Sequence, residues 1–142
     1  MDYQAMAERV CRMNFAHMRD FYRLFQSVAA QGEDAILLCL YLANRPMFAG
    51  EFIGKLGLTT GRIANILKRL EAKALVARIS DREDRRRVSV SLTEAGQRQA
   101  EQQYLQSVQK HRELLAYLGE ADAQELIRIL SRALEYSGRQ KA

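Results

Sequence analysis

The sequence predicts a mainly α-helical fold that contains one β-hairpin. Its 142 residues include a single proline, Pro46, so little interrupts long helices. Apolar residues recur every three or four positions along most of the chain, as on the buried face of a helix. In Val88–Leu92, by contrast, apolar residues alternate with serines, which is typical of a strand. Hydrophobic residues make up 48% of the chain, enough for a core and too many for a disordered protein.

The first 44 residues predict two helices. Residues 1–29 carry two apolar stripes, as in a helix shared between a core and a partner. Gln31-Gly32 ends this helix, and the very apolar segment Glu33–Asn44 predicts a second helix at the centre of a core. Arg45-Pro46 then ends the second helix, because the residue before proline is pushed out of the helical conformation.

Two shorter helices separated by a glycine turn are predicted next. The first covers Ala49–Leu56, with Gly57 as its left-handed cap, and the second begins at Thr59 or Thr60 and extends to about Lys73. Four apolar residues share the inner face of the second helix: Ile63, Ile66, Leu67 and Leu70. Its outer face carries Thr60, Gly61, Arg62, Asn65, Lys68 and Arg69. An apolar inside and a basic, amide-bearing outside are typical of a helix-turn-helix.

A hairpin and two further helices complete the pattern. The strands are predicted at Ala74–Ser80 and Val88–Leu92, joined by the charged loop Asp81–Arg87. Thr93 opens a long helix that Gly119 interrupts, and Asp122–Ser137 predicts the last helix. These helices carry more apolar surface than a small module can cover, which favours self-association. We therefore expect a winged helix-turn-helix over residues 31–96, flanked by dimerisation regions at 1–30 and 97–142.

The positive charge is concentrated in one region. The chain carries +5 overall, yet the stretch from Lys55 to Arg87 alone has ten basic and four acidic residues, a net +6. Such a region is expected of a surface that binds phosphates. A solvated helix face is the alternative, although such faces usually interleave the two signs and Arg85-Arg86-Arg87 does not.

The stretch from Asp81 to Gly96, DREDRRRVSVSLTEAG, closely resembles the wing signature of the MarR family of regulators. That signature is an Asp, a basic residue and an Arg, then an alternating strand, then Leu-Thr-x-x-Gly. Lys55–Thr59 and Leu67–Val76 look like the helix-turn-helix of that family, with Ala74 where a glycine is usual. The resemblance implies a homodimeric DNA-binding regulator of transcription. It also implies a triangular dimer in which the first and last two helices of both chains interlock, with a pocket for a small-molecule effector between this region and the DNA-binding lobes.

The chemistry of the side chains and the resemblance to the MarR family together predict which residues contact DNA. A helix fits the major groove, where Arg62 and Asn65 could reach base edges. By resemblance, Arg86 enters the narrow minor groove and Asp84 braces its guanidinium fork; a weak surface salt bridge is the alternative. The full set of expected DNA-binding residues is Thr59, Thr60, Gly61, Arg62, Asn65, Lys68, Arg69, Asp84, Arg85, Arg86 and Arg87.

Three hypotheses of function can be compared on these residues. The first is a repressor that binds a palindromic operator in double-stranded DNA and responds to a small ligand. The second is a winged-helix module for protein–protein contact, whose face should carry exposed apolar anchors. The third is an enzyme, but the sequence offers no nucleophile–base pair, glycine-rich phosphate loop or paired carboxylates. We expect the first, with no enzymatic activity.

The remaining candidates predict no cofactor and no metal. Cys11 is expected to be a buried, inert thiol. The alternative is a reactive thiol like that of some peroxide-sensing members of the MarR family, which pair it with tyrosines; Phe25 and Asp34 lie near where those tyrosines would be expected. Cys39 is expected in the core. His17 and His111 could meet Asp34 at a metal, but they lack a spacing motif. Nothing resembles a secretion signal, and the longest apolar run is about half the roughly 20 residues that a membrane span needs. A reducing cytoplasm is the expected location.

Overall fold

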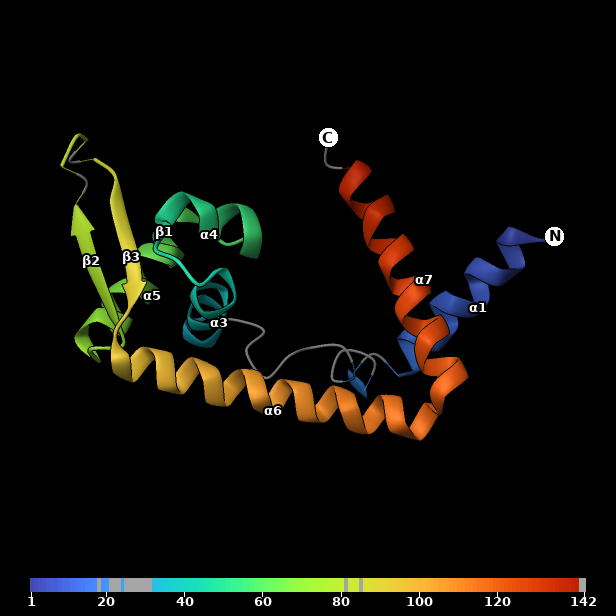
Figure 1. Ribbon diagram of the computed structural model, residues 1–142. Coiled ribbons are helices and arrows are strands. Elements are labelled where there is room, and N and C mark those ends of the chain that lie inside the picture. The colour runs from blue at the N-terminus through green and yellow to red at the C-terminus, as the bar shows by residue number, and fades with distance from the viewer. Residues whose placement is uncertain (18, 21–23, 25–31, 81, 85, 141–142) are drawn as a thin grey trace. The chain divides into compact units, whose positions relative to one another are not determined.

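The computed structural model describes residues 1–17, 19–20, 24, 32–80, 82–84 and 86–140. Two compact units make up the chain, Gln26–Ser107 on one hand and Met1–Phe25 with Val108–Ala142 on the other. The helices and strands, labelled in Figure 1, are α1 (Tyr3–Ala16), α3 (Glu33–Ala43), β1 (Met47–Phe48), α4 (Ala49–Leu56), α5 (Thr60–Ala72), β2 (Val76–Ser80), β3 (Val88–Leu92), α6 (Glu94–Leu118) and α7 (Glu120–Arg139).

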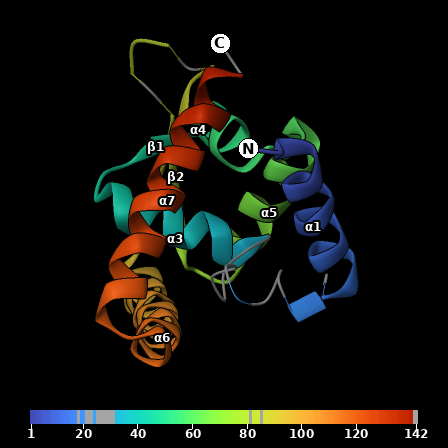
Figure 2. The same cartoon turned by 90° about the vertical axis from the view of Figure 1, so that its right-hand side faces the viewer.

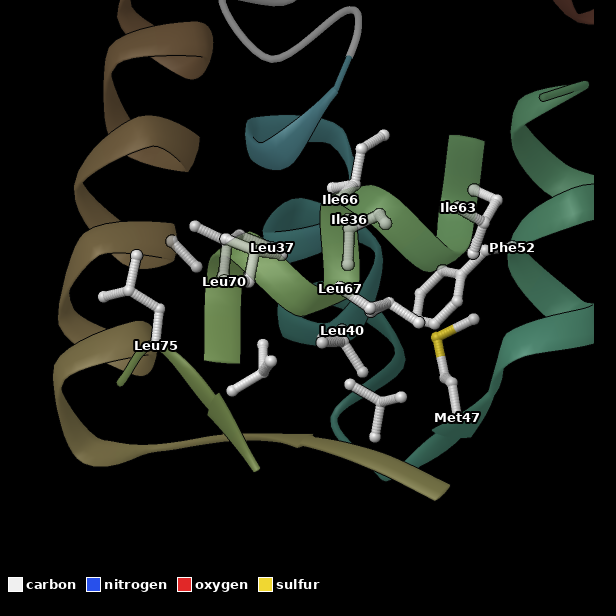
Figure 3. Packing of buried hydrophobic residues seen from close by; sticks show 13 residues of the cluster. Ile36, Leu37, Leu40, Met47, Phe52, Ile63, Ile66, Leu67, Leu70 and Leu75 are labelled. Atoms are coloured by element: carbon white, nitrogen blue, oxygen red, sulfur yellow. The ribbon is translucent and has the colours of Figure 1, made fainter. Parts of the chain in front are cut away.

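The core of the first unit lies where α3, α4 and α5 meet the sheet. Figure 3 shows apolar side chains of the three helices turned toward one another, with Met47 of β1 beside Phe52 of α4. The inner face predicted for α5 is confirmed, because Ile63, Ile66, Leu67 and Leu70 are each at most 2% exposed. This packing fixes α5 in one orientation about its axis and leaves its opposite face in solvent.

The sheet has three antiparallel strands in the order β1-β3-β2. The predicted hairpin is confirmed, with Arg78 opposite Val90 in its register. The sequence pattern did not predict β1, which pairs Met47 with Val90 on the other edge of β3. Two residues are too few to display a strand's alternation. In Figures 1 and 2 the hairpin tip projects beyond α4 and α5, as a wing does.

Strand β2 starts at Val76 rather than at Ala74, because α5 ends in a left-handed cap. Ala74 has a φ of 55°. Its N–H donates to the carbonyl of Glu71, and the N–H of Leu75 donates to that of Leu70. This pair of bonds is the Schellman motif, whose left-handed position is usually glycine. The cap geometry is therefore kept with alanine in that position.

Thr93 and Gly96 join the start of α6 to this cap. The Thr93 hydroxyl donates to the carbonyl of Ala74 at 2.6 Å and accepts the N–H of Gly96 at 3.0 Å. The N–H of Thr93 donates to the carbonyl of Leu75 at 3.1 Å. A Cβ at Gly96 would lie 1.9 Å from that same carbonyl oxygen. The Leu-Thr-x-x-Gly segment thus holds the start of α6 against the end of α5, through the hydrogen bonds of Thr93 and the close backbone approach at Gly96.

The second unit contains α1, the end of α6 and α7. The uninterrupted first helix predicted over residues 1–29 is wrong at one point: α1 ends at Ala16, although no glycine or proline marks that end. Arg19, Asp20 and Leu24 are again helical, and most of residues 18–31 lie outside the described part of the chain. The predicted break at Gly119 is confirmed, with a φ of 83° there. Among the described residues, no helix is long and apolar enough to cross a membrane.

Candidate nucleic-acid interface

Helix α5 presents a polar face to solvent. The expected contact residues Thr60, Gly61, Arg62, Asn65 and Lys68 are all exposed, opposite the buried apolar side. Arg62 and Lys68 form no ion pair with another described residue, so their charges stay available to an external partner. A positively charged, amide-bearing helix face of this kind suits the major groove of DNA.

The turn before α5 sets the position of this face. Gly57 caps α4 with a φ of 65°, in the left-handed region as expected. Thr59 is the N-cap of α5, and its hydroxyl accepts the N–H of Arg62 at 3.2 Å. The Thr59 hydroxyl thus satisfies one N–H group at the start of α5. The other free N–H groups of the first turn, and the positive end of the helix dipole, remain in solvent. Both attract phosphate.

At the wing tip, Asp84 organises the backbone. Its carboxylate accepts the N–H of Arg86 at 3.0 Å, and its carbonyl accepts the N–H of Arg87 at 2.9 Å. The brace is thus to the main chain of Arg86, whereas the resemblance implied its guanidinium. Arg86 and Arg87 are exposed. Arg85 and Asp81 lie outside the described residues.

A cleft of about 750 Å³ lies between the start of α5 and the wing. Thr60 lines one side and Arg86 and Arg87 line the other, so residues from both predicted contact elements meet there. The lining residues that were not predicted as contacts include Arg45, Phe48, Glu51 and Arg78. A Glu at the third position of a helix is a known capping signal and could have identified Glu51.

Most of the cations at this cleft have partners in the protein. Arg45 donates to both oxygens of Glu51, at 2.6 and 3.2 Å, and this contact, with the N–H of Phe48, lowers the Glu51 pKa to about 2. Arg78 is paired with Glu71 of α5. The guanidinium of Arg87 stacks on the Phe48 ring, 3.9 Å from its centroid. Arg86, in contrast, forms no ion pair with another described residue.

Arg69 is the one expected contact residue of α5 with an acidic partner. Its Nε donates to Glu33 of α3 at 3.1 Å, and Lys73 donates to the other oxygen of Glu33 at 2.6 Å. These two cations, with the Lys73 hydrogen bond foremost, hold the Glu33 pKa below its ordinary value. Arg69 therefore points toward the flank of α5 that faces the first turn of α3.

The cysteine and histidine candidates form no described site. Cys11 is exposed on α1, so its expected burial is wrong: α1 buries none of its residues in this chain. Cys39 packs against the core while partly exposed, and burial raises the pKa of its thiol. Asp34 accepts a hydrogen bond from Gln103 at 2.6 Å. In the ranges that the structure describes, no three His, Cys, Asp or Glu side chains could hold a metal together.

A helix-turn-helix followed by a basic β-hairpin defines this chain as a winged-helix protein. Comparisons with known proteins agree with this class. A model described as MarR family matches residues 36–87. The HTH-type transcriptional regulator TtmR of Methylorubrum extorquens (strain PA1) is 31% identical over 99 residues, which are 67% of this chain and 51% of that protein. The chain thus spans about half the length of this curated relative.

Solved structures share the fold over nearly the whole chain. The S. aureus MepR–DNA complex has a TM-score of 0.63 at 20% identity, covering 96% of this chain and 98% of that one. The PcaV transcriptional regulator from Streptomyces coelicolor, in complex with its natural ligand, has a TM-score of 0.63 at 18% identity, covering 96% and 97%. The chain belongs to the MarR family.

Proposed function

We propose that this protein is a transcriptional repressor that binds a palindromic operator in double-stranded DNA as a homodimer. The observation that carries the proposal is the pairing of two exposed cationic elements on one packed module. The outer face of α5 offers Arg62, Asn65 and Lys68 to the major groove. The wing offers Arg86, without an ion-pair partner among the described residues, to the adjacent minor groove.

The composition of the α5 face favours DNA over a protein partner. A protein-binding face carries apolar anchors at its centre. The large apolar residues of α5 are all buried, and its solvent face is polar or cationic. The MepR structure was solved with DNA, and MepR shares this fold.

The apolar surface of α7 supports the homodimer. None of its residues is buried within the chain, and Ile127, Leu130 and Leu134 are 54%, 39% and 71% exposed. Helix α1 likewise buries none of its residues. Surface of this kind on a small protein is normally covered by another chain. A second copy is the partner we propose, because a symmetric dimer presents two α5 helices to the two halves of a palindrome.

A small-molecule effector is part of the proposal. The PcaV regulator, which shares the fold, was solved with its natural ligand. We propose that an effector adjusts the affinity of this chain for its operator as well.

The salt dependence of DNA binding tests the proposal. Fluorescence anisotropy with a random-sequence duplex should give an affinity whose logarithm falls linearly with the logarithm of the salt concentration. Lys68→Ala should make the slope shallower by about one for each subunit on the duplex, or about two for the dimer, since each lost phosphate contact removes about 0.9. Arg112→Ala removes the same charge from exposed α6 outside the winged helix and should leave the slope unchanged. Absence of duplex binding by the wild-type protein would reject the function.

A further inference from the structure

Glu33 holds two cations of the helix that we assign to the major groove. One carboxylate oxygen accepts from Arg69 at 3.1 Å and the other from Lys73 at 2.6 Å. The side chain of Glu33 is 23% exposed, whereas those of Arg69 and Lys73 are 61% and 57% exposed. The acid is thus mostly enclosed, while both bases remain accessible to a second anion.

Arg69 of α5 and Lys73, the C-cap of that helix, lie where DNA phosphates are expected. Successive residues of a helix are turned by about 100°, so Arg69 lies on the flank next to Lys68, at the edge of the outer face. A helix about 10–12 Å across fills a major groove about 12 Å wide, which brings a phosphate backbone along each flank. Lys73 lies four residues after Arg69 on the same flank. A carboxylate there occupies cations that phosphates would otherwise contact.

We propose that Glu33 competes with DNA phosphates for Arg69 and Lys73, and so limits the affinity of the protein for non-specific DNA. This inference rests on the proposed DNA-binding function. Phosphate contacts contribute affinity without sequence information, whereas base contacts such as those expected of Asn65 discriminate between sequences. Neutralising two cations beside the reading face therefore weakens the unspecific part of binding more than the specific part. Glu33 acts as a determinant of specificity without touching a base.

A purely structural pair is the competing interpretation. In that case the ion pairs of Glu33 only stabilise the packing of α3 against α5. Replacing Glu33 would then lower the melting temperature without raising the affinity for DNA. An exposed pair of this kind contributes little to stability. Competition with DNA thus predicts a rise in DNA affinity when Glu33 is replaced, and a purely structural pair predicts none, so a measurement of affinity separates the two interpretations.

The experiment compares Glu33→Gln with a matched control on random-sequence duplex at about 0.15 M salt. Glu125→Gln is the control, because it removes the same charge and likewise releases an arginine, Arg128, but on α7. We expect Glu33→Gln to raise the affinity about 3- to 10-fold and to steepen the salt slope by about one to two for each bound subunit, as one or two phosphates there gain a contact. Glu125→Gln should match the wild type. Circular dichroism establishes that each variant is folded.

A triple variant separates release of these two cations from a general change in charge. Glu33→Gln combined with Arg69→Gln and Lys73→Gln should lose the whole gain in affinity and in slope. A gain that persists in the triple variant would overturn the proposal. Unchanged or reduced affinity in Glu33→Gln, with wild-type protein that binds, would overturn it while leaving the proposed function intact. Wild-type protein that binds no duplex would overturn both.

Discussion

At Gly96, the first turn of α6 passes directly against the carbonyl of Leu75. A methyl group there would lie 1.9 Å from that oxygen, and both atoms belong to backbones that neighbouring hydrogen bonds hold in place. We expect Gly96→Ala to lower the free energy of unfolding by about 2–4 kcal/mol, since overpacking without a flexible neighbour forces the backbone to shift. Urea denaturation at fixed protein concentration measures the loss.

Gly54 of α4 is the matched control for this prediction. A Cβ at Gly54 meets nothing within 4 Å, and the residue lies inside a helix. Gly54→Ala should therefore raise the stability by about 0.5–1 kcal/mol. Equal effects of the two substitutions would show that the close approach of α6 to Leu75 is not what requires glycine.

Ala74 carries a strain that glycine would remove. Its φ of 55° costs a residue with a Cβ roughly 1–2 kcal/mol, and the entropy of glycine in the unfolded chain offsets part of the gain. We expect Ala74→Gly to stabilise the protein by about 0.5–1 kcal/mol in the same urea titration. A destabilised Ala74→Gly variant would mean that the methyl group contributes more by contact than it costs by strain.

Single residues also mark where sequence reasoning succeeds and fails. The residue types at Gly57 and Thr59 predict their caps, because glycine favours the left-handed conformation and a threonine hydroxyl can accept an N–H of the first turn. The contacts of Arg69 and Arg87 could not be predicted in this way. Each depends on which residue of a distant element lies within reach, and that is a property of the packed fold.

Among the elements, the wing contains two neighbouring arginines in different environments. Arg87 stacks on Phe48 at the base of the cleft, while the backbone of Arg86 is held by Asp84 and its side chain forms no ion pair with a described residue. Of these two residues, Arg86 is therefore the one whose side chain can extend into a groove without giving up an ion pair or a stacking contact with a described residue.

This difference predicts unequal effects of two alanine substitutions. Arg86→Ala should weaken binding to the specific operator by roughly 1–3 kcal/mol, and binding to random duplex by much less. Arg87→Ala should lower both affinities to a smaller and similar extent, through general phosphate attraction. Anisotropy titrations on the two duplexes measure all four values. Equal losses for the two variants on both duplexes would reject the special role of Arg86.

The elements themselves follow from periodicity where they are long. Helices α5, α6 and α7 and the hairpin match their predicted patterns, because many positions contribute to each. Strand β1 was missed because two residues form it, and the end of α1 at Ala16 carries no breaking residue. Nor does the sequence pattern alone predict the cleft between α5 and the wing, which exists only once the hairpin has docked on the helices.

For the whole molecule, the proposed dimer places a second copy over α7. We expect light scattering at micromolar concentration to give twice the 16.3 kDa of one chain. Leu130→Asp should give a monomeric or poorly folded protein, since an unpaired buried charge costs several kcal/mol. Gln140→Asp, after the end of α7, adds the same charge and should remain dimeric. A stable, folded 16.3 kDa wild-type monomer would reject the dimer.

Selection of bound sequences from a random pool of DNA duplexes tests the central proposal most directly. A two-fold dimer places both α5 helices on the same side of the duplex, in major grooves about one turn apart. The expected product is an inverted repeat with half-sites roughly 10 base pairs apart, centre to centre. Inserting about 5 base pairs between the halves should then remove most of the specific binding, on the order of 4–10 kcal/mol. Selection that enriches no sequence, or an enriched site whose affinity ignores the half-turn insertion, would contradict sequence-specific binding by paired winged helices.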